Sequence, residues 1–423
     1  MHRLKPTRIQ VPHHTDAATN ISAWPIAQEH DKLTSGHTLY LDNAATTPLA
    51  PEVAHRLAES YHRGWANPAS QHRAGRQAQA ALEDAKDQIK ALCLGSNQHS
   101  VLQSWQLVIT SGGTEANNLA VRGLAASSRG SLFVSAVEHP SVLAASSEAQ
   151  SLSARCQVVP VDRHGHVNID ALHTWLQDAA ATAVVSVMAG NNETGIVQNL
   201  ERISEVCRAH NALLHCDAVQ ALGKLPFEAF VPWVDAFTVS AHKLHGPIGV
   251  GALLVRSSVA LKPLLHGGGQ QLALRPGSES VPLVAAMAAA CELAERHRAS
   301  GGMLRVSSLR QTFEAGILAA GLDAEVIGNE VARLPHISSI AFPGLNRQAL
   351  LMALDLVGVQ CSSGSACASG SSQSSHVLTA MQLPPLWVEG AIRFSFSRYS
   401  TDAQVSEAID RISAVVKKLR KRG

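Results

Sequence analysis

Short apolar runs recur along the chain from Leu39 onward, and they alternate with segments whose apolar residues have helical spacing. The runs lie at residues 107–109, 132–137, 156–161, 183–188, 212–216, 236–239 and 249–255. Segment 201–211, ERISEVCRAHN, is typical of the helical stretches between them. Strands that alternate with helices indicate an α/β layer built mostly on parallel strands. We therefore predict a large domain over residues 53–298 with a mostly parallel, seven-stranded sheet.

The pattern changes after residue 298. The chain is then expected to form, in order, a helix at 303–320, a strand at 336–342, a helix at 347–357 and a strand at 391–397. A final helix should begin at TDAQ, residues 401–404, which has the pattern of a capping box. We predict a smaller α+β domain made of residues 37–52 and 299–423. Residues 1–36 are polar and aperiodic, and we predict that they form an extension outside the fold.

Composition argues against several classes of protein. The 423 residues include 35 basic and 33 acidic side chains, which gives no reason to expect a nucleic-acid surface. No run reaches the roughly 18 apolar residues of a membrane span, so no membrane partner is expected. The seven cysteines are scattered and form no CxxC pair, which favours a reducing, cytoplasmic location over a disulfide scaffold or zinc site. His164 and His166 have no third ligand at metal-site spacing, so no metal is predicted.

The stretch SGGTEANN, residues 111–118, follows a predicted strand and begins a predicted helix. Gly113 and Thr114 stand near the start of that helix, where backbone N–H groups and a hydroxyl favour a phosphate. The stretch matches neither a P-loop nor a GxGxxG motif. An ordinary strand-to-helix turn explains it equally well, so it indicates a phosphate site only together with other evidence.

Two further strand ends carry an aspartate and a lysine. Asp217 lies in HCDAVQ and Lys243 lies 26 residues later in SAHK, each at the carboxyl end of a predicted strand, where open α/β sheets bind ligands. A lysine that bonds covalently to pyridoxal 5'-phosphate (PLP) and an aspartate that holds its ring nitrogen protonated suit this arrangement. Ser240 and His242 flank the lysine and are candidate phosphate donors. Taken singly, the aspartate is equally a cap and the lysine a solvated charge.

Two more polar motifs follow predicted strands. His139, in EHPS, is placed to lie on a cofactor ring and move protons, although a single histidine is more often structural. Asn192, in MAGNNETG, offers an amide to a ring oxygen. Four polar strand ends that converge on one edge of a sheet favour a PLP site over four unrelated turns.

Ten motifs in order resemble those of the cysteine desulfurases, PLP enzymes of the class V aminotransferase group with the fold-type I scaffold. The resemblance covers about residues 39–416. The motifs are YLDNAATTP (40–48), NPAS (67–70), SGGTEANN (111–118), EHPS (138–141), NNETG (191–195), CDAVQ (216–220), SAHKLHGPIGVG (240–251), HGGGQQLALRPGS (266–278), SSGSAC (362–367) and IRFSFSR (392–398). The SSGSAC motif and the chain after it resemble the branch with a longer, mobile cysteine loop.

The resemblance implies a role for each matching residue. It makes Lys243 the PLP-bonded lysine, His139 the stacking acid–base group and Asp217 the partner of the ring nitrogen. It assigns further PLP contacts to Gly113, Thr114, Asn192, Gln220, Ser240 and His242. Arg393 matches the arginine that binds the substrate carboxylate, with Asn192 beside the substrate. Ser278 stands where the family usually has a threonine that reaches the phosphate of the other subunit, which implies a homodimer.

Cys367 matches the nucleophile that accepts sulfur from L-cysteine as a persulfide, with L-alanine as the other product. The resemblance further implies a sulfur-acceptor protein, either a cluster scaffold or a sulfur carrier. Small residues around Cys367 suit a thiol that must enter the site and then leave it with sulfur. Cys361, six residues earlier, is expected to pack at the end of a strand.

Two alternatives stay open on the sequence. A selenocysteine lyase or another class V PLP lyase has the same cofactor residues. A non-catalytic sulfur-carrier or scaffold protein would keep the fold, but the presence of the lysine, aspartate, histidine and cysteine argues against it.

Overall fold

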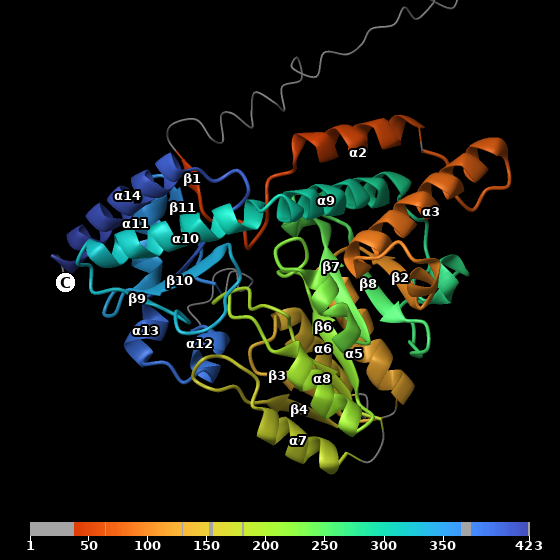
Figure 1. Ribbon diagram of the computed structural model, residues 1–423, viewed down its shortest axis with the longest axis horizontal. Coiled ribbons are helices and arrows are strands. Elements are labelled where there is room, and N and C mark those ends of the chain that lie inside the picture. Colours follow the sequence, from red (N-terminus) through yellow and green to blue (C-terminus); the bar gives the residue numbers. More distant parts are fainter. Residues whose placement is uncertain are drawn as a thin grey trace, which may run out of the picture.

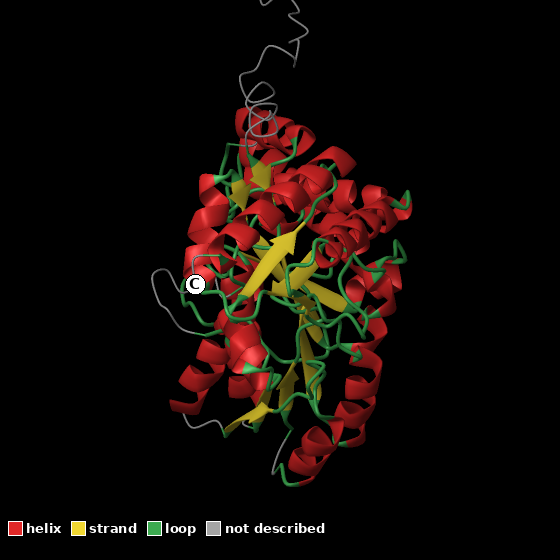
Figure 2. Cartoon of the chain, turned by 90° about the vertical axis from the view of Figure 1, so that its left-hand side faces the viewer, coloured by secondary structure: helices red, strands yellow, loops and turns green. Residues whose placement is uncertain are grey.

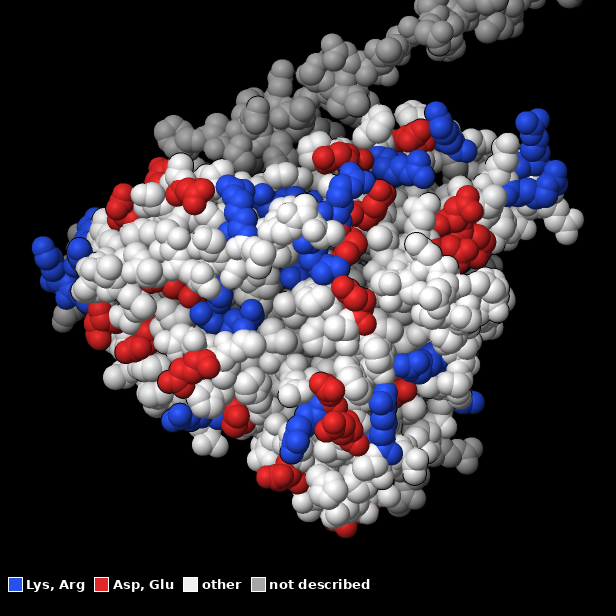
Figure 3. Space-filling model, in the orientation of Figure 1, with Lys and Arg blue, Asp and Glu red and all other residues white. Residues whose placement is uncertain are grey.

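The computed structural model describes residues 38–63, 65–128, 130–151, 155–179, 182–364 and 374–421. Cys367 and the predicted extension 1–36 therefore lie outside the described residues. Figure 1 shows a large α/β part around a twisted sheet and a second group of helices and strands beside it. On the face drawn in Figure 3, acidic and basic side chains are interspersed.

A seven-stranded sheet forms the centre of the large part, in the order β2-β8-β7-β6-β5-β3-β4. Its strands are β2 (Trp105–Thr110), β3 (Leu132–Ser135), β4 (Cys156–Val159), β5 (Val184–Ser186), β6 (Leu213–Asp217), β7 (Ala236–Ser240) and β8 (Gly251–Arg256). Neighbours from β7 to β4 pair in parallel, whereas β8 is antiparallel to both β7 and β2. The predicted mostly parallel, seven-stranded sheet is thus confirmed.

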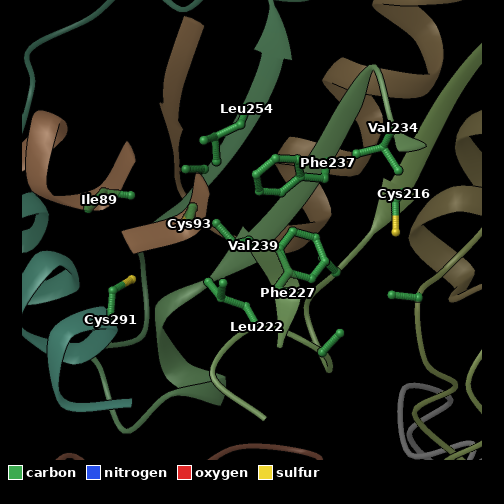
Figure 4. Close-up of a cluster of buried hydrophobic side chains, with 14 of the residues drawn as sticks. Ile89, Cys93, Cys216, Leu222, Phe227, Val234, Phe237, Val239, Leu254 and Cys291 are labelled. Atoms are coloured by element: carbon green, nitrogen blue, oxygen red, sulfur yellow. The ribbon is translucent and has the colours of Figure 1, made fainter. Parts of the chain in front are cut away.

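Helices cover both faces of this sheet (Figure 1). They are α2 (Pro51–Arg63), α3 (Arg73–Leu94), α4 (His99–Gln103), α5 (Gly113–Ser128), α6 (Pro140–Ser151), α7 (Ile169–Gln177), α8 (Leu200–Ala209) and α9 (Val281–Ala299). Alternate strand residues enter different cores because strand side chains point to opposite faces. Leu132 and Val134 pack with α5 and α6, while Phe133 belongs to the core that includes α3 and α9. Figure 4 shows part of the core that includes α3 and α9, where Phe237 and Val239 of β7 lie among buried side chains.

The remaining elements are built mainly from the second half of the chain and form a separate buried core. They are α10 (Gly302–Ala319), β9 (Glu325–Val326), β10 (Ile337–Ala341), α11 (Arg347–Leu356), β11 (Val359–Gln360), α12 (His376–Ala380), α13 (Pro385–Glu389), β12 (Ala391–Ser395) and α14 (Asp402–Arg420). An antiparallel sheet has the order β12-β10-β9, and β1 (Leu39–Tyr40) runs parallel to β11. The first described strand is thereby joined to one formed more than 300 residues later. Figure 2 views these elements from their side of the molecule.

The capping box predicted at the last helix is present. The Thr401 side chain accepts a hydrogen bond from the Gln404 backbone N–H, and the Gln404 side-chain oxygen accepts one from the Thr401 backbone N–H. Several predicted strands are longer than the observed ones. The run 156–161 yields only β4, because the chain leaves the sheet at Pro160, which has no N–H to donate. Among the helices within the described ranges, none combines the length and apolar character needed to cross a bilayer.

Candidate active site

A cavity of about 320 Å³ opens beyond the carboxyl ends of β3, β5, β6 and β7. Its walls include the start of α5 and residues from β12, so both groups of elements contribute. The predicted site residues that line it are Gly113, Thr114, His139, Asn192, Asp217, Gln220, Ser240, His242, Lys243 and Arg393. The parallel sheet explains this convergence, because parallel strands end at the same edge.

Lys243 ends the 3₁₀ turn η4 (Ala241–Lys243) that follows β7. Its Nζ donates to the backbone oxygen of Ala44 at 2.6 Å and also to that of Ala45. The two acceptors come from the segment after β1, almost 200 residues earlier in the chain. The amine is therefore held at the cavity wall by backbone groups, without a carboxylate among these hydrogen-bond partners.

Asp217 and His139 are connected by two intermediate side chains. The Asn117 Nδ2 donates to Asp217 Oδ2 at 2.7 Å and to Ser141 Oγ at 2.9 Å, and Ser141 Oγ lies 2.7 Å from His139 Nδ1. The Val219 N–H adds a bond to the other Asp217 oxygen at 3.0 Å. Burial lowers the pKa of His139, which favours the neutral ring. The chain of side chains fixes the directions of both the carboxylate and the ring.

Asn117 and Ser141 were missed as individual site residues. Both lie inside the motifs SGGTEANN and EHPS, so the signal was present in the sequence. Asn117 is fully buried in α5, and its Oδ1 has no hydrogen-bond partner within the described part of the chain. A polar side chain buried on a mostly apolar helix face is the clue that identifies such a residue.

The start of α5 is suited to an anion. A Cβ built on Gly113 would lie 3.1 Å from Val219 Cγ2, so glycine keeps this corner open. Ser240 is 2% exposed, and its Oγ has no hydrogen-bond partner among the residues that the structure describes. Exposed backbone N–H groups at the first turn of this 16-residue helix add further donors.

His242 and Gln220 line the same cavity but have protein partners. His242 Nδ1 lies 3.1 Å from Thr46 Oγ1, and burial, reinforced by the charge of Lys243, lowers the pKa of His242 to about 4. Gln220 donates to the Ala44 oxygen at 2.8 Å, and its Oε1 lies 3.2 Å from His336 Nε2. Gln220 therefore hydrogen-bonds the same segment after β1 that accepts the hydrogen bonds of Lys243, a contact that the sequence did not predict.

Arg393 brings a guanidinium from β12 to the wall of the cavity. It is 3% exposed, and it donates to Asp42 Oδ1 at 2.7 Å and to the Asn192 backbone oxygen at 2.9 Å. Its Nε has no hydrogen-bond partner in the described ranges. A buried guanidinium with an unused donor beside a cavity can bind a carboxylate.

Two buried carboxyl groups near the cavity were also missed. Glu138 accepts from Ser135 Oγ at 2.6 Å and from the Met188 N–H at 2.8 Å, and burial raises the pKa of Glu138 to about 8. Glu193 accepts from Ser375 Oγ at 2.6 Å, and burial raises its pKa as well. Each glutamate adjoins a predicted site residue in sequence, yet it points into the protein rather than toward the cavity lining.

The described residues just before Cys367 reach the site. Gly364 lines the cavity, and Ser362 exchanges backbone hydrogen bonds of 2.6 and 3.2 Å with Arg393. Cys361 packs against the core of the small sheet, where burial raises the pKa of its thiol far above the usual range. That packing agrees with the structural role predicted for Cys361.

Among the described residues predicted for the site, Ser278 is the one that does not line this cavity. It is exposed and borders a second cavity of about 730 Å³, with Gln271, Leu272 and Glu279 among the neighbours there.

Comparison with known proteins identifies the family. The family described as "Aminotransferase class-V" matches residues 39–407. A "Cysteine desulfurase" of Gluconacetobacter diazotrophicus is 38% identical over 387 residues, which are 91% of this chain and 94% of that protein. One of Sinorhizobium fredii is 39% identical over 387 residues, 90% of this chain and 97% of that protein.

Solved structures of similar proteins agree with this result. The NifS-like protein from Rickettsia africae is 29% identical with a TM-score of 0.81, and the match covers 90% of this chain and all of that one. The structure titled "SspA in complex with cysteine" is 28% identical with a TM-score of 0.72, and the match covers 86% of this chain and all of that one. This chain belongs to the class V aminotransferase family and, within it, to the cysteine desulfurases.

Proposed function

We propose that this chain is a PLP-dependent cysteine desulfurase that converts L-cysteine to L-alanine and takes the sulfur on Cys367. One observation carries the proposal. The amine of Lys243, the carboxylate of Asp217, the ring of His139 and the guanidinium of Arg393 share one cavity of about 320 Å³. A cavity lined by an amine, a carboxylate and a carboxylate-binding cation suits an amino-acid substrate on PLP.

The residues present fit PLP. The open corner at Gly113, the unpartnered Ser240 Oγ and the first turn of α5 suit its phosphate, with Thr114 and His242 beside them. Asp217, fixed by Asn117, suits the ring nitrogen. Lys243 would hold the cofactor covalently, His139 would lie against its ring, and Asn192 and Gln220 would border it. When bound, PLP supplies an electron sink for the electron pair left on the substrate Cα after deprotonation.

The protein residues then have separate tasks. Arg393 binds the substrate carboxylate and so orients Cα. The Lys243 amine takes the Cα proton, since it is the amine on the cavity wall and its Nζ is directed by the Ala44 and Ala45 oxygens. The His139 ring is kept neutral by burial and can exchange a proton at Nε2, while Ser141 holds its Nδ1.

Cys367 completes the reaction by accepting sulfur. Its thiolate attacks the substrate sulfur, a new S–S bond forms, and the Cβ–S bond of the substrate breaks. Cβ gains a proton, the proton that Lys243 took from Cα is returned there, and the carbon fragment leaves as L-alanine. L-cysteine and one enzyme thiol thus give L-alanine and one enzyme persulfide. A thiolate is required because the protonated thiol is a poor nucleophile.

A homodimer and a sulfur-acceptor protein belong to the same proposal. Ser278 would reach the phosphate of the second subunit. That Ser278 borders another cavity of its own chain instead of the proposed PLP site supports this assignment. Leu272, which borders the same cavity as Ser278, is 72% exposed, which supports a covered surface there. We further propose a cytoplasmic location, in keeping with the scattered cysteines, and delivery of the persulfide sulfur to a cluster scaffold or sulfur carrier.

We also propose a division into a large domain of residues 53–298 and a small domain of residues 37–52 and 299–423, with residues 1–36 as an extension. The separate cores of the two sheets support it.

The test is a cysteine assay on purified, PLP-loaded protein that measures alanine and protein-bound sulfur together. We expect one persulfide sulfur on Cys367 for each alanine released in the first turnover, before any reductant is added. Alanine release without a persulfide, or an equal rate in Cys367→Ser, would favour the lyase alternative.

A further inference from the structure

A small cavity of about 30 Å³, separate from the proposed PLP site, is also lined by Lys243. The basic and titratable residues that line it are Lys224, Lys243, His245, His336 and Arg398. None of the described residues on its wall is an aspartate or a glutamate. Positively charged groups thus lie close together there without a carboxylate to neutralise them, which costs folding free energy. Such a cost suggests that the arrangement serves a function.

Lys224 contacts the turn that carries Lys243. The Lys224 Nζ donates to the backbone oxygen of Lys243 at 3.0 Å. The preceding Gly223 has φ +68°, and a Cβ built there would lie 2.7 Å from the Ala294 Cβ of α9. Glycine therefore lets the chain turn tightly against α9, and this turn directs the Lys224 side chain toward Lys243.

The charges of the two lysines are coupled. Burial, the largest cause, and the positive charges of Lys243 and Arg398 together lower the pKa of Lys224 to about 7. The other titratable neighbours are His336, whose pKa is lowered chiefly by burial, and His245. Because interaction between two charges is mutual, a charge on Lys224 also opposes a proton on the Lys243 nitrogen.

We propose that Lys224 is a positioning residue for Lys243. It anchors the backbone of the Lys243 turn, and while it is protonated its positive charge favours the unprotonated form of the Lys243 nitrogen. An unprotonated amine is the form that attacks a carbonyl and accepts a proton, and a neighbouring cation is a known means of producing it. The Ala44 and Ala45 oxygens accept hydrogen bonds from Lys243 and so favour its protonated form. The charge of Lys224 has the opposite effect on the Lys243 nitrogen. The inference rests on the proposed role of Lys243 as the PLP-bonded lysine.

The experiment separates the hydrogen bond from the charge. The variants are Lys224→Met, Lys224→Gln and Lys224→Arg, with Lys417→Met, an exposed position on α14, as the matched control. Each PLP-loaded protein is titrated from pH 5 to 10, and the visible absorption that reports the proton on the lysine-bound nitrogen is recorded. We expect the midpoint to rise by about half a unit or more in Met and Gln. It should remain near the wild-type value in Arg and in the control.

Two results would overturn the inference. A midpoint in Lys224→Met equal to that of wild type would mean that the charge does not act on Lys243. A midpoint in Lys224→Gln equal to that of wild type would mean that the hydrogen-bond donor at this position, and not its charge, sets the midpoint. Cofactor retention and thermal unfolding are measured on the same samples, and a variant with lost PLP but an unchanged midpoint in its residual loaded fraction also refutes the charge effect. Wild-type protein that acquires no lysine-linked absorption would refute the proposed function itself, which is a distinct outcome.

Discussion

Two groups of residues in the active-site cavity are built in different ways, and we call them the cofactor end and the substrate end after their proposed roles. At the cofactor end, Asp217 ends one strand, Lys243 follows the neighbouring strand of the same sheet, and Asn117 and Ser141 join the aspartate to His139. At the substrate end, Arg393 comes from another sheet and is held by Asp42 and by the Asn192 backbone. The residues of the first end are carried by one sheet and its covering helices, although Lys243 also donates to Ala44 and Ala45 of the segment after β1. Arg393 of the second end is brought to the cavity by another sheet. Cofactor binding and substrate binding should therefore respond to different substitutions.

Lys243→Ala should break the cofactor end completely. Loss of the covalent anchor and of the base should reduce alanine production by at least about 10²–10⁴-fold, the usual contribution of a general base alone. The measurement is borohydride reduction of the wild-type and variant proteins followed by peptide mapping. A reduced PLP label on any other lysine would contradict the assignment.

Cys367→Ser should leave both ends intact and abolish sulfur transfer, since a serine hydroxyl is too weak an acid and too hard a nucleophile to replace a thiolate. The variant should bind PLP, change its absorption with cysteine and release neither alanine nor sulfide above background. Cys361→Ser, at a thiol packed against a core, is the matched control and should keep most of its activity. A persulfide found by mass spectrometry on Cys361 would identify the wrong carrier.

Arg393→Ala should affect the substrate end alone. Loss of hydrogen bonds to a charged group, worth about 1.5–3 kcal/mol, should raise the KM for cysteine roughly 10- to 150-fold. The Kd for PLP, measured by absorption, should change much less. An unchanged KM combined with lost PLP would reverse the roles of the two ends.

Asn117→Ala should weaken the cofactor end more gently. Asp217 would lose its 2.7 Å donor, and the affinity for PLP should fall by about 1–2 kcal/mol, or roughly 5- to 30-fold. The neighbouring Asn118, which is partly exposed, provides the control as Asn118→Ala. Equal losses in both variants would mean that α5 itself, rather than the contact to Asp217, had been disturbed.

The smallest effect concerns Glu138, which lies in the wall behind the cofactor end. Its pKa rises from 4.5 to about 8 on folding, so the folded protein keeps a proton that the unfolded chain releases between these values. Stability from this group is thus greatest below pH 4.5 and is lost as the pH rises to about 8. Glu138→Gln should flatten the decline of Tm between pH 5 and 8 by a few degrees. An unaltered profile would show that the carboxyl is ionised throughout.

Sequence reasoning predicted the cofactor end better than the substrate end. Asp217 and Lys243 could be assigned together because they follow apolar runs that become parallel strands with a common edge. The contact of Arg393 with Asp42 spans 351 residues and depends on how two sheets pack, which no local pattern encodes. Asn117 and Ser141 were missed for another reason. Their motif was visible, but the direction of a side chain on a helix becomes clear only once its neighbours are placed.

The segment after β1 is held in place by β12, and this has a consequence for how the protein folds during its synthesis. Asn43 Nδ2 and the Ala44 N–H bind Ser395 at 2.8 Å each, so the backbone oxygens that receive the Lys243 amine are fixed by a residue translated about 350 positions later. At about 5–20 residues per second, a ribosome needs roughly 20 to 70 seconds to cover that interval. The large sheet can assemble meanwhile, but its lysine then lacks the finished wall against which it is seated. Capture of the cofactor should consequently be a late event, completed only when nearly the whole polypeptide has emerged.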